Sequence, residues 1–454
     1  MSESTQVIFA TVVFLITYAV IVSEKIHRTV VALVGASLMA LTKIISLEQA
    51  TEAIDFNTIG LLVGMMIIVG ITKRTGIFEY LAIKAAKGSK GEPLKIIAAL
   101  SLITAVISAF LDNVTTVLLI VPVTFAIAKQ LELNPLPFLI AEIFASNIGG
   151  TATLIGDPPN IMIGSATGLG FMDFVFNLTA AIILIYVLTI FCIQIIYRKQ
   201  LVARPELQAV IMKINEKDEI KDAKLLLKCL VVLFLTVLGF ILHQYMHLES
   251  SVIALSGASL LLLVSGDDPE HSLHAVEWPV IFFFIGLFVV VGALEKVGVI
   301  EATAKWSLGV TGGNMVPSSM LILWLSAIAS AFVDNIPFVA TMIPLIHDVG
   351  RLGGITDLNL LWWALSLGAC LGGNGTAIGA SANVVVIGIA EKKGLYISFI
   401  EYMKVAFPLM LMSIAVSMGY LLFWYFFHTM VAMVVTLGIA TVLALLLKPL
   451  SKMI

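Results

Sequence analysis

The stretch SAFLDNVTTVLLIVP at residues 108–122 recurs 222 positions later as SAFVDNIPFVATMIP at residues 330–344, with seven of the fifteen positions identical. Each copy is apolar on both sides and carries an Asp-Asn pair in its middle. An ionisable residue inside an apolar segment is costly and marks a functional site by default. Shared hydrophobicity would not align Asp-Asn and Pro in the same order, so the sequence predicts an internal duplication.

A second pair of segments extends the duplication. GGTATLIGDPPN at 149–160 recurs as GGNGTAIGASAN at 372–383, now 223 positions apart and with six of twelve positions identical. Glycines in the preceding regions also pair at 222, for example Gly64 with Gly286. The repeat therefore covers almost the whole chain.

Composition places the chain in a bilayer. The 454 residues are 60% hydrophobic and 12% charged, with a mean hydropathy of +1.07, whereas soluble domains are about 25% charged. The net charge of -3 gives no indication of a nucleic-acid partner. Three cysteines in or beside apolar runs form neither a disulfide framework nor a metal motif. No cofactor is expected beyond a coupling ion, sodium or a proton.

Apolar stretches of about 20 residues, the length that spans a bilayer, occur in the same order in both halves. Each half is predicted to contain five spanning helices, one of them broken, and a re-entrant hairpin split by its Asp-Asn pair. The predicted fold is an all-α polytopic membrane protein of two inverted repeats plus one extra C-terminal helix. The predicted parts are an N-terminal repeat at 1–203 with hairpin 94–129 and broken helix 136–168, a basic cytoplasmic linker at 204–227, a C-terminal repeat at 228–428 with hairpin 317–350 and broken helix 359–391, and a final helix and tail at 429–454.

The odd number of spans per half predicts that the second copy is inverted. Basic loops favour the cytoplasmic side, and under this count Arg28, the loop 73–95 and the linker fall on one side. The exceptions are Asp267, Asp268 and Glu270 on that side and Lys296 and Lys305 on the other. The first apolar run lacks a basic leader and a cleavage site, so it is predicted to be retained. We expect an integral protein of the cytoplasmic (inner) membrane, with its N-terminus outside and its C-terminus in the cytoplasm.

The two Asp-Asn pairs are the sharpest candidates for a site. Asp and Asn favour turns and helix caps, so Asp112-Asn113, with Thr115 beside it, and Asp334-Asn335 are predicted to form the hairpin tips. At such tips, backbone groups leave the helical hydrogen-bond ladder and can bind an ion. The alternative interpretation is that each aspartate only caps the helix that follows.

The glycine-rich breaks are the second candidate. Half-helix N-termini attract anionic groups and unwound carbonyls attract cations. The predicted binding residues in the breaks are Gly149, Gly150, Thr153, Asp157, Asn160, Gly372, Gly373, Asn374, Thr376 and Asn383. The alternative is that the glycines serve close helix packing alone.

The two halves differ in charge. Asp157 aligns with Ala380, and Glu142 has no acidic counterpart; Glu142 is either a carboxylate at membrane depth or a residue near the headgroups. No Lys or Arg stands beside the carboxylates of Asp112, Asp157, Asp334 and Glu142 in sequence. Carboxylates without a basic partner require a cation or a proton, which favours coupling to sodium or protons.

The strings FLDNVTTVLLIVP, NIGGTATLIGDPPN, FVDNIPF and LGGNGTAIGASANVV resemble the ArsB/NhaD family, and most closely its melanosomal P protein branch. The sequence is more remotely similar to the divalent anion/sodium symporters. Those carry Ser-Asn-Thr at each tip, where this chain has Asp-Asn-Val and Asp-Asn-Ile, which argues against a dicarboxylate substrate.

The resemblance implies a homodimer, an elevator movement of a transport part against a scaffold, and sodium sites near Asn113, Gly150, Asn335 and Gly373. It also implies a small ion or solute as substrate. We expect an ion-coupled secondary transporter and no enzyme, with sodium/proton exchange first. Arsenite or antimonite efflux and sodium-coupled anion transport are the alternatives. From other classes, an ion channel and an intramembrane aspartyl protease, with Asp112 and Asp334 sharing a proton, remain open.

Overall fold

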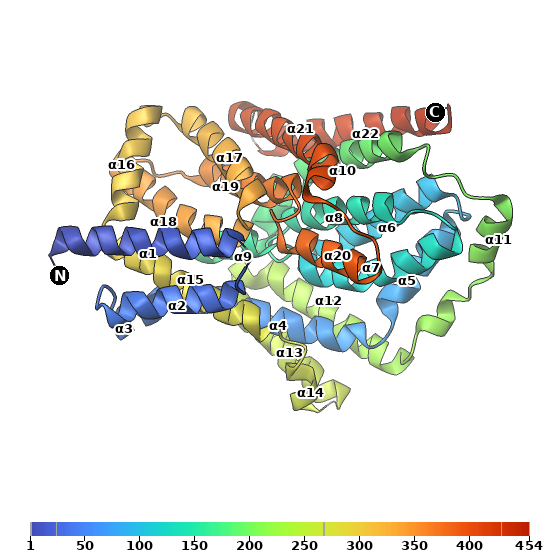
Figure 1. The fold of residues 1–454 in the computed structure, drawn as a ribbon, viewed down its shortest axis with the longest axis horizontal. Coiled ribbons are helices and arrows are strands. Elements are labelled where there is room, and N and C mark those ends of the chain that lie inside the picture. The colour runs from blue at the N-terminus through green and yellow to red at the C-terminus, as the bar shows by residue number, and fades with distance from the viewer. Residues whose placement is uncertain (1, 24, 267, 428, 454) are drawn as a thin grey trace.

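The computed structural model describes residues 2–23, 25–266, 268–427 and 429–453, with side chains up to residue 447. Asp267 of the predicted acidic loop and the two terminal residues lie outside this part. The described residues form 22 α-helices and no β-strand (Figure 1). Nine of these helices are long and apolar enough to cross a membrane. The predicted all-α polytopic fold is therefore confirmed.

The helices occur in the same order in both copies. The first copy contains α1 (Glu3–Ser23), α2 (Arg28–Leu41), α3 (Leu47–Ala53), α4 (Phe56–Lys73), α5 (Ile77–Gly88), α6 (Pro93–Ser108), α7 (Asn113–Gln130), α8 (Leu136–Thr151), α9 (Pro158–Thr167) and α10 (Phe171–Tyr197). The second contains α12 (Ala223–Met246), α13 (Ser250–Ser265), α14 (Pro269–Leu273), α15 (Trp278–Lys296), α16 (Val299–Thr311), α17 (Met315–Phe332), α18 (Asn335–Gly353), α19 (Asn359–Gly372), α20 (Ser381–Lys392) and α21 (Phe399–Phe427).

Three helical segments lie outside this correspondence. The linker contains α11 (Pro205–Lys213) and a short 3-10 helix (Glu216–Glu219), and α22 (Thr429–Met453) is the extra C-terminal helix. α12 begins at Ala223 because the Asp222 carboxylate accepts hydrogen bonds from the N–H groups of Lys224 and Leu225. The first turn of α12 therefore lies within the range predicted for the linker.

The copies run in opposite directions. α5 lies at the right-hand end of Figure 1 and its counterpart α16 at the left-hand end. The N-terminus is likewise on the left, while the linker around α11, which leads into the second copy, is on the right. This arrangement confirms the inverted repeat.

One group of helices, here called the frame, consists of α1–α4 and α12–α15. In the frame, helices of each copy pack on helices of the other copy. α4 packs on α13, and α15 packs on α2. A Cβ added at Gly64 would lie 2.6 Å from the backbone of Ala254, and one at Gly286 would lie 2.7 Å from that of Ala32. Small residues let helix backbones approach this closely in a membrane, so each copy's glycine helix is fitted to the other copy.

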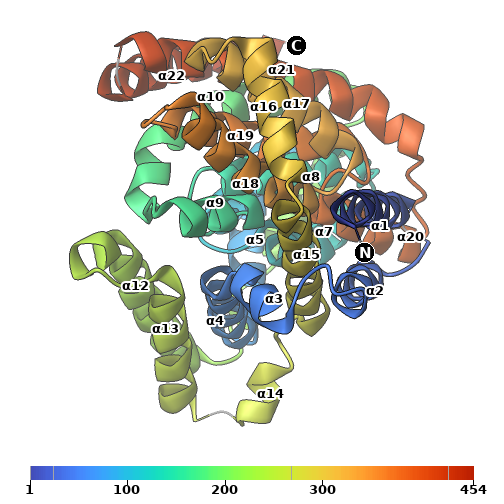
Figure 2. The same ribbon diagram turned by 90° about the vertical axis from the view of Figure 1, so that its left-hand side faces the viewer.

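The hairpins and broken helices, with the helices that surround them, form a second group, here called the hairpin module (α6–α10 and α17–α22). Its helices α10, α19, α21 and α22 lie in the upper part of Figure 2, whereas α2–α4 and α12–α14 of the frame lie in the lower part. Within the module, α6 packs on α8 and α17 on α19. Gly149 and Gly372 permit this, because an added Cβ would lie 2.2 Å and 2.5 Å from the carbonyl oxygens of Ala105 and Ala327.

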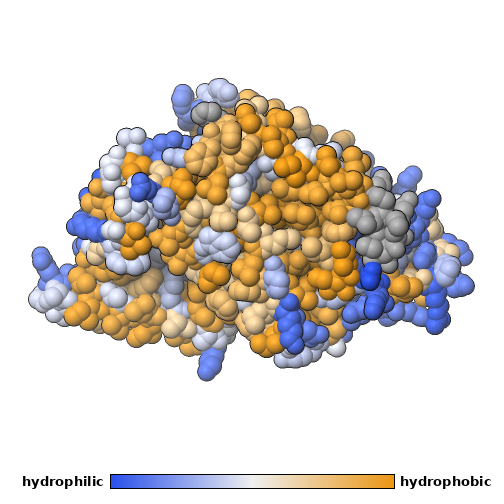
Figure 3. All heavy atoms as spheres, turned by 90° about the horizontal axis from the view of Figure 1, so that it is seen from above, coloured by the Kyte–Doolittle hydropathy of each residue, from blue (hydrophilic) through white to orange (hydrophobic). Residues whose placement is uncertain are grey.

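The outer surface is that of a lipid-embedded protein. Figure 3 shows a face dominated by hydrophobic residues, with hydrophilic side chains gathered mainly toward the periphery. Large apolar side chains such as Leu15, Phe234 and Leu445 are exposed. Exposed apolar area on this scale needs lipid as solvent, so the apolar side chains face the bilayer while the polar groups of the hairpin tips lie inside.

Candidate functional site

Both Asp-Asn pairs lie at hairpin tips. Asp112 precedes α7 and its Oδ1 accepts a hydrogen bond from the N–H of Thr115 at 2.8 Å; Asp334 precedes α18 and its Oδ1 accepts one from the N–H of Ile336 at 3.3 Å. Each aspartate is therefore a helix cap, as the alternative interpretation predicts. Capping uses only one carboxylate oxygen, so it does not exclude a second role.

The asparagine of each pair points into the protein. The Asn113 side-chain amide donates to Oδ1 of Asn147 at 3.0 Å, and that of Asn335 donates to Oδ1 of Asp157 at 3.3 Å. Asn147 lies in α8 and Asp157 precedes α9, so both tips contact the broken helix of the first copy. The two hairpins thus meet inside the protein.

A network of amides connects the two broken helices. Asn147 donates to the side-chain oxygens of Asn374 and Asn383, at 2.9 Å and 3.0 Å. Asn383 in turn donates to the carbonyl oxygens of Gly373 and Thr376, at 2.7 Å and 2.8 Å. The second break is therefore held open by a side chain that satisfies its free carbonyls.

The first break is held in the same way. Asn160, the counterpart of Asn383, donates to the carbonyl oxygens of Thr151 and Thr153 at 3.0 Å and 2.9 Å. Its own oxygen accepts from the Ser366 hydroxyl at 2.6 Å, and the Cys370 thiol lies 3.7 Å away. Cys370 aligns with Asn147, so each asparagine is contacted by the equivalent position of the other copy.

The threonines and second glycines of the breaks fix the backbone. The hydroxyl of Thr153 donates to the Ala109 carbonyl at 2.5 Å, and that of Thr376 donates to the Ala331 carbonyl, which ties each hairpin to its break. An added Cβ at Gly150 would lie 2.5 Å from the Gly156 oxygen. Gly373 is placed equivalently against Gly379. Close packing, the alternative interpretation for the glycines, is therefore one of their roles.

The tips enclose a small cavity of about 30 Å³. Its polar lining includes Asp112, Asn113, Asp157, Asn335 and Glu277. A volume of this size holds a water molecule or a small ion and is too small for an organic solute. Four of the predicted site residues thus face one cavity, and the frame supplies its other wall through Leu62 and Met66 of α4.

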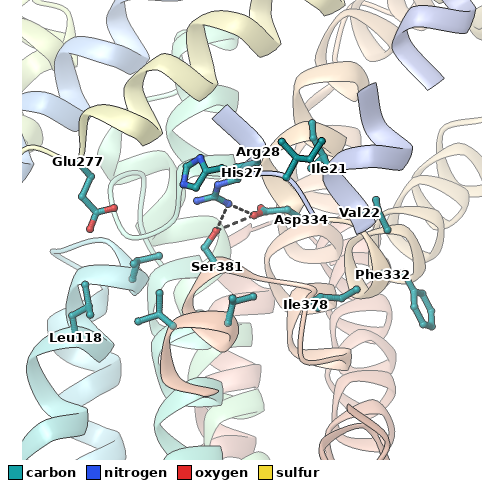
Figure 4. Close-up of a pocket in the computed structure, with 14 residues that line it drawn as sticks. Ile21, Val22, His27, Arg28, Leu118, Glu277, Phe332, Asp334, Ile378 and Ser381 are labelled. Carbon is teal, nitrogen blue, oxygen red and sulfur yellow. Dashed lines mark hydrogen bonds and ion pairs between the residues drawn. The ribbon is translucent and has the colours of Figure 1, made fainter. Parts of the chain in front are cut away.

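A second cavity, of about 360 Å³ and here called the larger cavity by comparison with the small one, adjoins it. The two cavities share four lining residues, Arg28, Val114, Glu277 and Ser381. The larger cavity is bordered by the end of α1, through Val22, and by the α1–α2 connection, through His27 (Figure 4). A third cavity of about 400 Å³, lined by Asp55, Glu295 and His347 among others, has no described residue in common with either. In this structure the tip site therefore adjoins the larger cavity and not the third.

Asp334 differs from the sequence-based expectation. Arg28, the first residue of α2, donates to Asp334 Oδ2 and to the Ser381 hydroxyl, the latter at 2.7 Å; Ser381 also donates to Asp334 at 2.9 Å (Figure 4). The premise that no basic residue accompanies the carboxylates is wrong for Asp334. Arg28 is 306 positions away, so proximity in sequence could not reveal it.

Asp157 keeps an unsatisfied oxygen. The residue has no solvent exposure, and its Oδ2 has no hydrogen-bond partner within the described part of the chain. The Cys370 thiol also interacts with this carboxylate, but a thiol is a weak donor. The carboxylate between the two tips is therefore poorly compensated.

Glu142 of α8 is a second buried carboxylate. Its Oε1 accepts from the Thr124 hydroxyl, and its Oε2 has no partner among the described residues. Its burial favours the membrane-depth interpretation over one near the headgroups. Among the residues that the structure describes, no group of His, Cys, Asp and Glu has the arrangement of a metal site.

The structure separates the predicted residues into two groups. Asp112, Asn113, Asp157 and Asn335 line the small cavity and Asp334 the larger one. The others support the breaks or the packing around them, and Thr115 contributes its N–H to the Asp112 cap. The site also contains four residues that the sequence did not predict as members: Arg28, Asn147, Glu277 and Ser381. Asn147, two residues before the first Gly-Gly pair, is the one whose position offered a signal.

Comparison with known proteins shows independently which kind of protein this chain is. Residues 18–368 match the family described as citrate transporter, CitMHS. The chain belongs to the CitMHS family. It is 45% identical over 92% of its length to the uncharacterized transporter Rv2684 of Mycobacterium tuberculosis, with 99% of that protein covered. It is 38% identical over 93% of its length to the human P protein, of which 60% is covered.

A solved structure shows the same fold. The YdaH transporter of Alcanivorax borkumensis aligns with a TM-score of 0.57 at 17% identity, covering 93% of this chain and 98% of that one. This CitMHS member is therefore a membrane transporter of the P protein type. The similarity to P proteins agrees with part of the predicted resemblance, while the assignment to ArsB/NhaD stays a prediction.

The contacts of the tip aspartates also bear on the protease alternative. Asp334 forms its side-chain contacts with Arg28 and Ser381, and Asp112 caps α7. An aspartyl dyad needs two carboxylates that share one proton. The contacts of these two aspartates are those of helix caps and of an ion pair, which argues against a dyad between them.

Proposed function

We propose that this protein exchanges sodium for protons across the inner membrane, by alternating access of the hairpin module against the frame. The observation that carries the proposal is the Asp157 carboxylate between the two tips, fully buried and with one oxygen lacking a hydrogen-bond partner in the described part of the chain. A buried carboxylate without a partner is costly. A bound cation or proton removes that cost.

The charge around the tips supports a cation. The two adjoining cavities are lined by the carboxylates of Asp112, Asp157, Asp334 and Glu277 against the guanidinium of Arg28. Carboxylate and amide oxygens suit hard cations. Sodium at the tips and a proton in the return step would use the same carboxylates in turn, which is the requirement for exchange.

The arrangement of cavities supports alternating access. The cavities lie where frame and hairpin module meet, and the tip site adjoins the larger one but not the third. The adjoining cavity is bordered by the α1–α2 connection, which the basic loops predict to be cytoplasmic. We propose an elevator-like movement of the module toward the opposite side, in a homodimer with its N-terminus outside.

Proteoliposome flux tests this proposal. Vesicles with an internal pH dye should alkalinise when sodium is added outside, because protons leave as sodium enters, and choline in place of sodium should produce no signal. Arms with arsenite and antimonite test the efflux alternative. A sodium gradient that leaves the internal pH unchanged, in vesicles that transport another solute, would overturn sodium/proton exchange. Currents of single-channel size would favour a channel instead.

A second candidate is sodium-coupled uptake of a carboxylate. One observation favours it: Arg28 and Ser381 face the larger cavity, whose volume of about 360 Å³ fits a small organic anion. Arginine binds carboxylates well, and the family is described as citrate transporters. Sodium-dependent uptake of radiolabelled citrate would support this candidate. Pairing of Arg28 with Asp334 leaves less of its charge for an anion, so exchange is preferred.

A further inference from the structure

We infer that Arg28 acts as a built-in competitor for the transported cation: it ties the frame to Asp334 and Ser381 until a cation takes its place. The inference rests on the proposed cation transport and adds to it the residue that couples binding to movement.

Arg28 is anchored on the frame. It begins α2, and its guanidinium lies over the ring of Phe283 in α15, 5.0 Å from the ring centroid. The hydroxyl of the next residue, Thr29, donates to the carbonyl of Pro279, also in α15, at 2.6 Å. The cation–π contact of the guanidinium and the helix–helix hydrogen bond of the next residue therefore hold Arg28 on the frame.

The same guanidinium also reaches the hairpin module. Asp334 is the tip of the second hairpin and Ser381 begins α20, so the guanidinium contacts both elements at once (Figure 4). The side chains of Arg28 and Asp334 are only 26% and 12% exposed. A pair this shielded is screened less by salt than a surface pair, so it resists movement of the module.

The first tip lacks an equivalent contact within the described part of the chain. The position that corresponds to Arg28 at the offset of 222 is Ser250, which begins α13 and carries no positive charge. Asp112 can therefore bind a cation in the small cavity, whereas Asp334 is already paired with the positive charge of Arg28. A sodium ion that binds both tip aspartates must displace the guanidinium from Asp334, and displacement removes this charged contact between the frame and the module.

Hydrogen–deuterium exchange on the purified full chain tests the tie directly. In sodium-free choline buffer, Arg28→Gln should make the amides of residues 333–340 and 381–386 exchange about tenfold faster than in wild type, because a charge-assisted contact is lost. Lys25→Gln, which removes a nearby exposed positive charge, should leave exchange unchanged. Equal exchange in Arg28→Gln and wild type would overturn the tie.

Sodium titration then tests competition. Sodium should raise exchange of the same amides in wild type, and Arg28→Gln should reach half-maximal transport at about tenfold lower sodium. The charge swap Arg28→Asp with Asp334→Arg should restore slow exchange and show no response to sodium. Unaltered half-maximal sodium in Arg28→Gln would overturn competition. Failure of wild type to respond to sodium at all, with exchange still faster in Arg28→Gln, would instead count against the proposed function.

Discussion

The two copies of the repeat share their packing and differ in their charges. The glycines that let helices approach closely occur at equivalent positions, as with Gly149 and Gly372 against α6 and α17. The acidic groups do not: Asp157 precedes α9 where Ala380 precedes α20. Duplication has thus kept the scaffold symmetric while the polar centre has become one-sided.

The tips show the same contrast at closer range. Asp112 and Asp334 cap equivalent helices. Within the described part of the chain, however, Asp334 pairs with an arginine and Asp112 does not. Asn147 likewise bonds to two amides of the other copy, whereas its counterpart Cys370 offers a weak thiol donor. The comparison indicates that symmetry sets where the site lies and that the divergent residues set its chemistry.

The largest effect is expected at the acidic residue that has no counterpart. Asp157→Asn should lower flux by about two orders of magnitude, because the loss of a charge–ligand contact of about 3 kcal/mol corresponds to that factor. Proteoliposome flux measures it. Asn keeps the size of the side chain, so the melting temperature should stay close to that of wild type. Near-normal flux in this variant would remove Asp157 from the site.

Removal of charge at the two tips should reduce flux in both cases but affect stability in only one. Asp112→Asn and Asp334→Asn should each lower flux at least about tenfold, by the loss of a charged ligand. Asp334→Asn should also destabilise the fold by about 1–3 kcal/mol, because it leaves the partly buried Arg28 without its carboxylate. Thermal unfolding in detergent separates the two variants. Equal melting temperatures would contradict the asymmetry between the tips.

Substitutions at the symmetric glycines should have matching effects in the two copies. Gly149→Ala and Gly372→Ala should each destabilise the protein by about 1–3 kcal/mol, since the new methyl group would meet a backbone carbonyl. Gly388→Ala is the control, because its added Cβ would meet no described atom within 4 Å. The measurement is again thermal unfolding. A large difference between the first two variants would show that the packing is less symmetric than the sequence.

The smallest effect is expected in the linker, which packs on the first copy. Lys87 of α5 donates to Glu216 at 2.5 Å and holds the pKa of that carboxyl below its usual value of 4.5. Because the pKa of Glu216 is lower in the folded state, the contribution of this ion pair to stability is complete above pH 4.5. It is lost as the pH falls through the lowered pKa. Limited proteolysis of the linker should therefore accelerate at low pH in wild type.

A charge-neutral variant provides the control for this contact. Glu216→Gln should be cleaved faster than wild type at neutral pH and should show little further change on acidification, because it cannot be protonated. The effect is small since surface ion pairs contribute little to stability. A proteolysis rate in Glu216→Gln that follows wild type at every pH would show that the contact does not fasten the linker.

The fold was predictable in large part because an internal duplication can be recognised from a single sequence. The offset of 222 and the Asp-Asn pairs predicted the hairpins, and the Gly-Gly breaks predicted α8–α9 and α19–α20. The parity of the spans predicted the inversion. These features are local or periodic, and local features are what a sequence displays.

The candidate site was less accessible because its partners come from distant elements. Asp157 and Asn335 contact one another across 178 positions, and Arg28 reaches Asp334 across 306. An arginine at the start of an apolar helix is also the usual sign of a cytoplasmic loop, and this is what Arg28 indicates in the sequence. Which carboxylate lacks a basic partner depends on tertiary packing, so it follows only from the structure.

The exchanged packing of the frame has a consequence for how the chain is made. Gly64 is fitted to Ala254 and Gly286 to Ala32, so α2 and α4 enter the membrane long before their partners exist. At roughly 5–20 residues per second, about 220 residues take on the order of 10–40 s to synthesise. During that interval the packing surfaces of α2 and α4 lack their partner helices α15 and α13 and are exposed to lipid. These surfaces are where an insertion chaperone would bind.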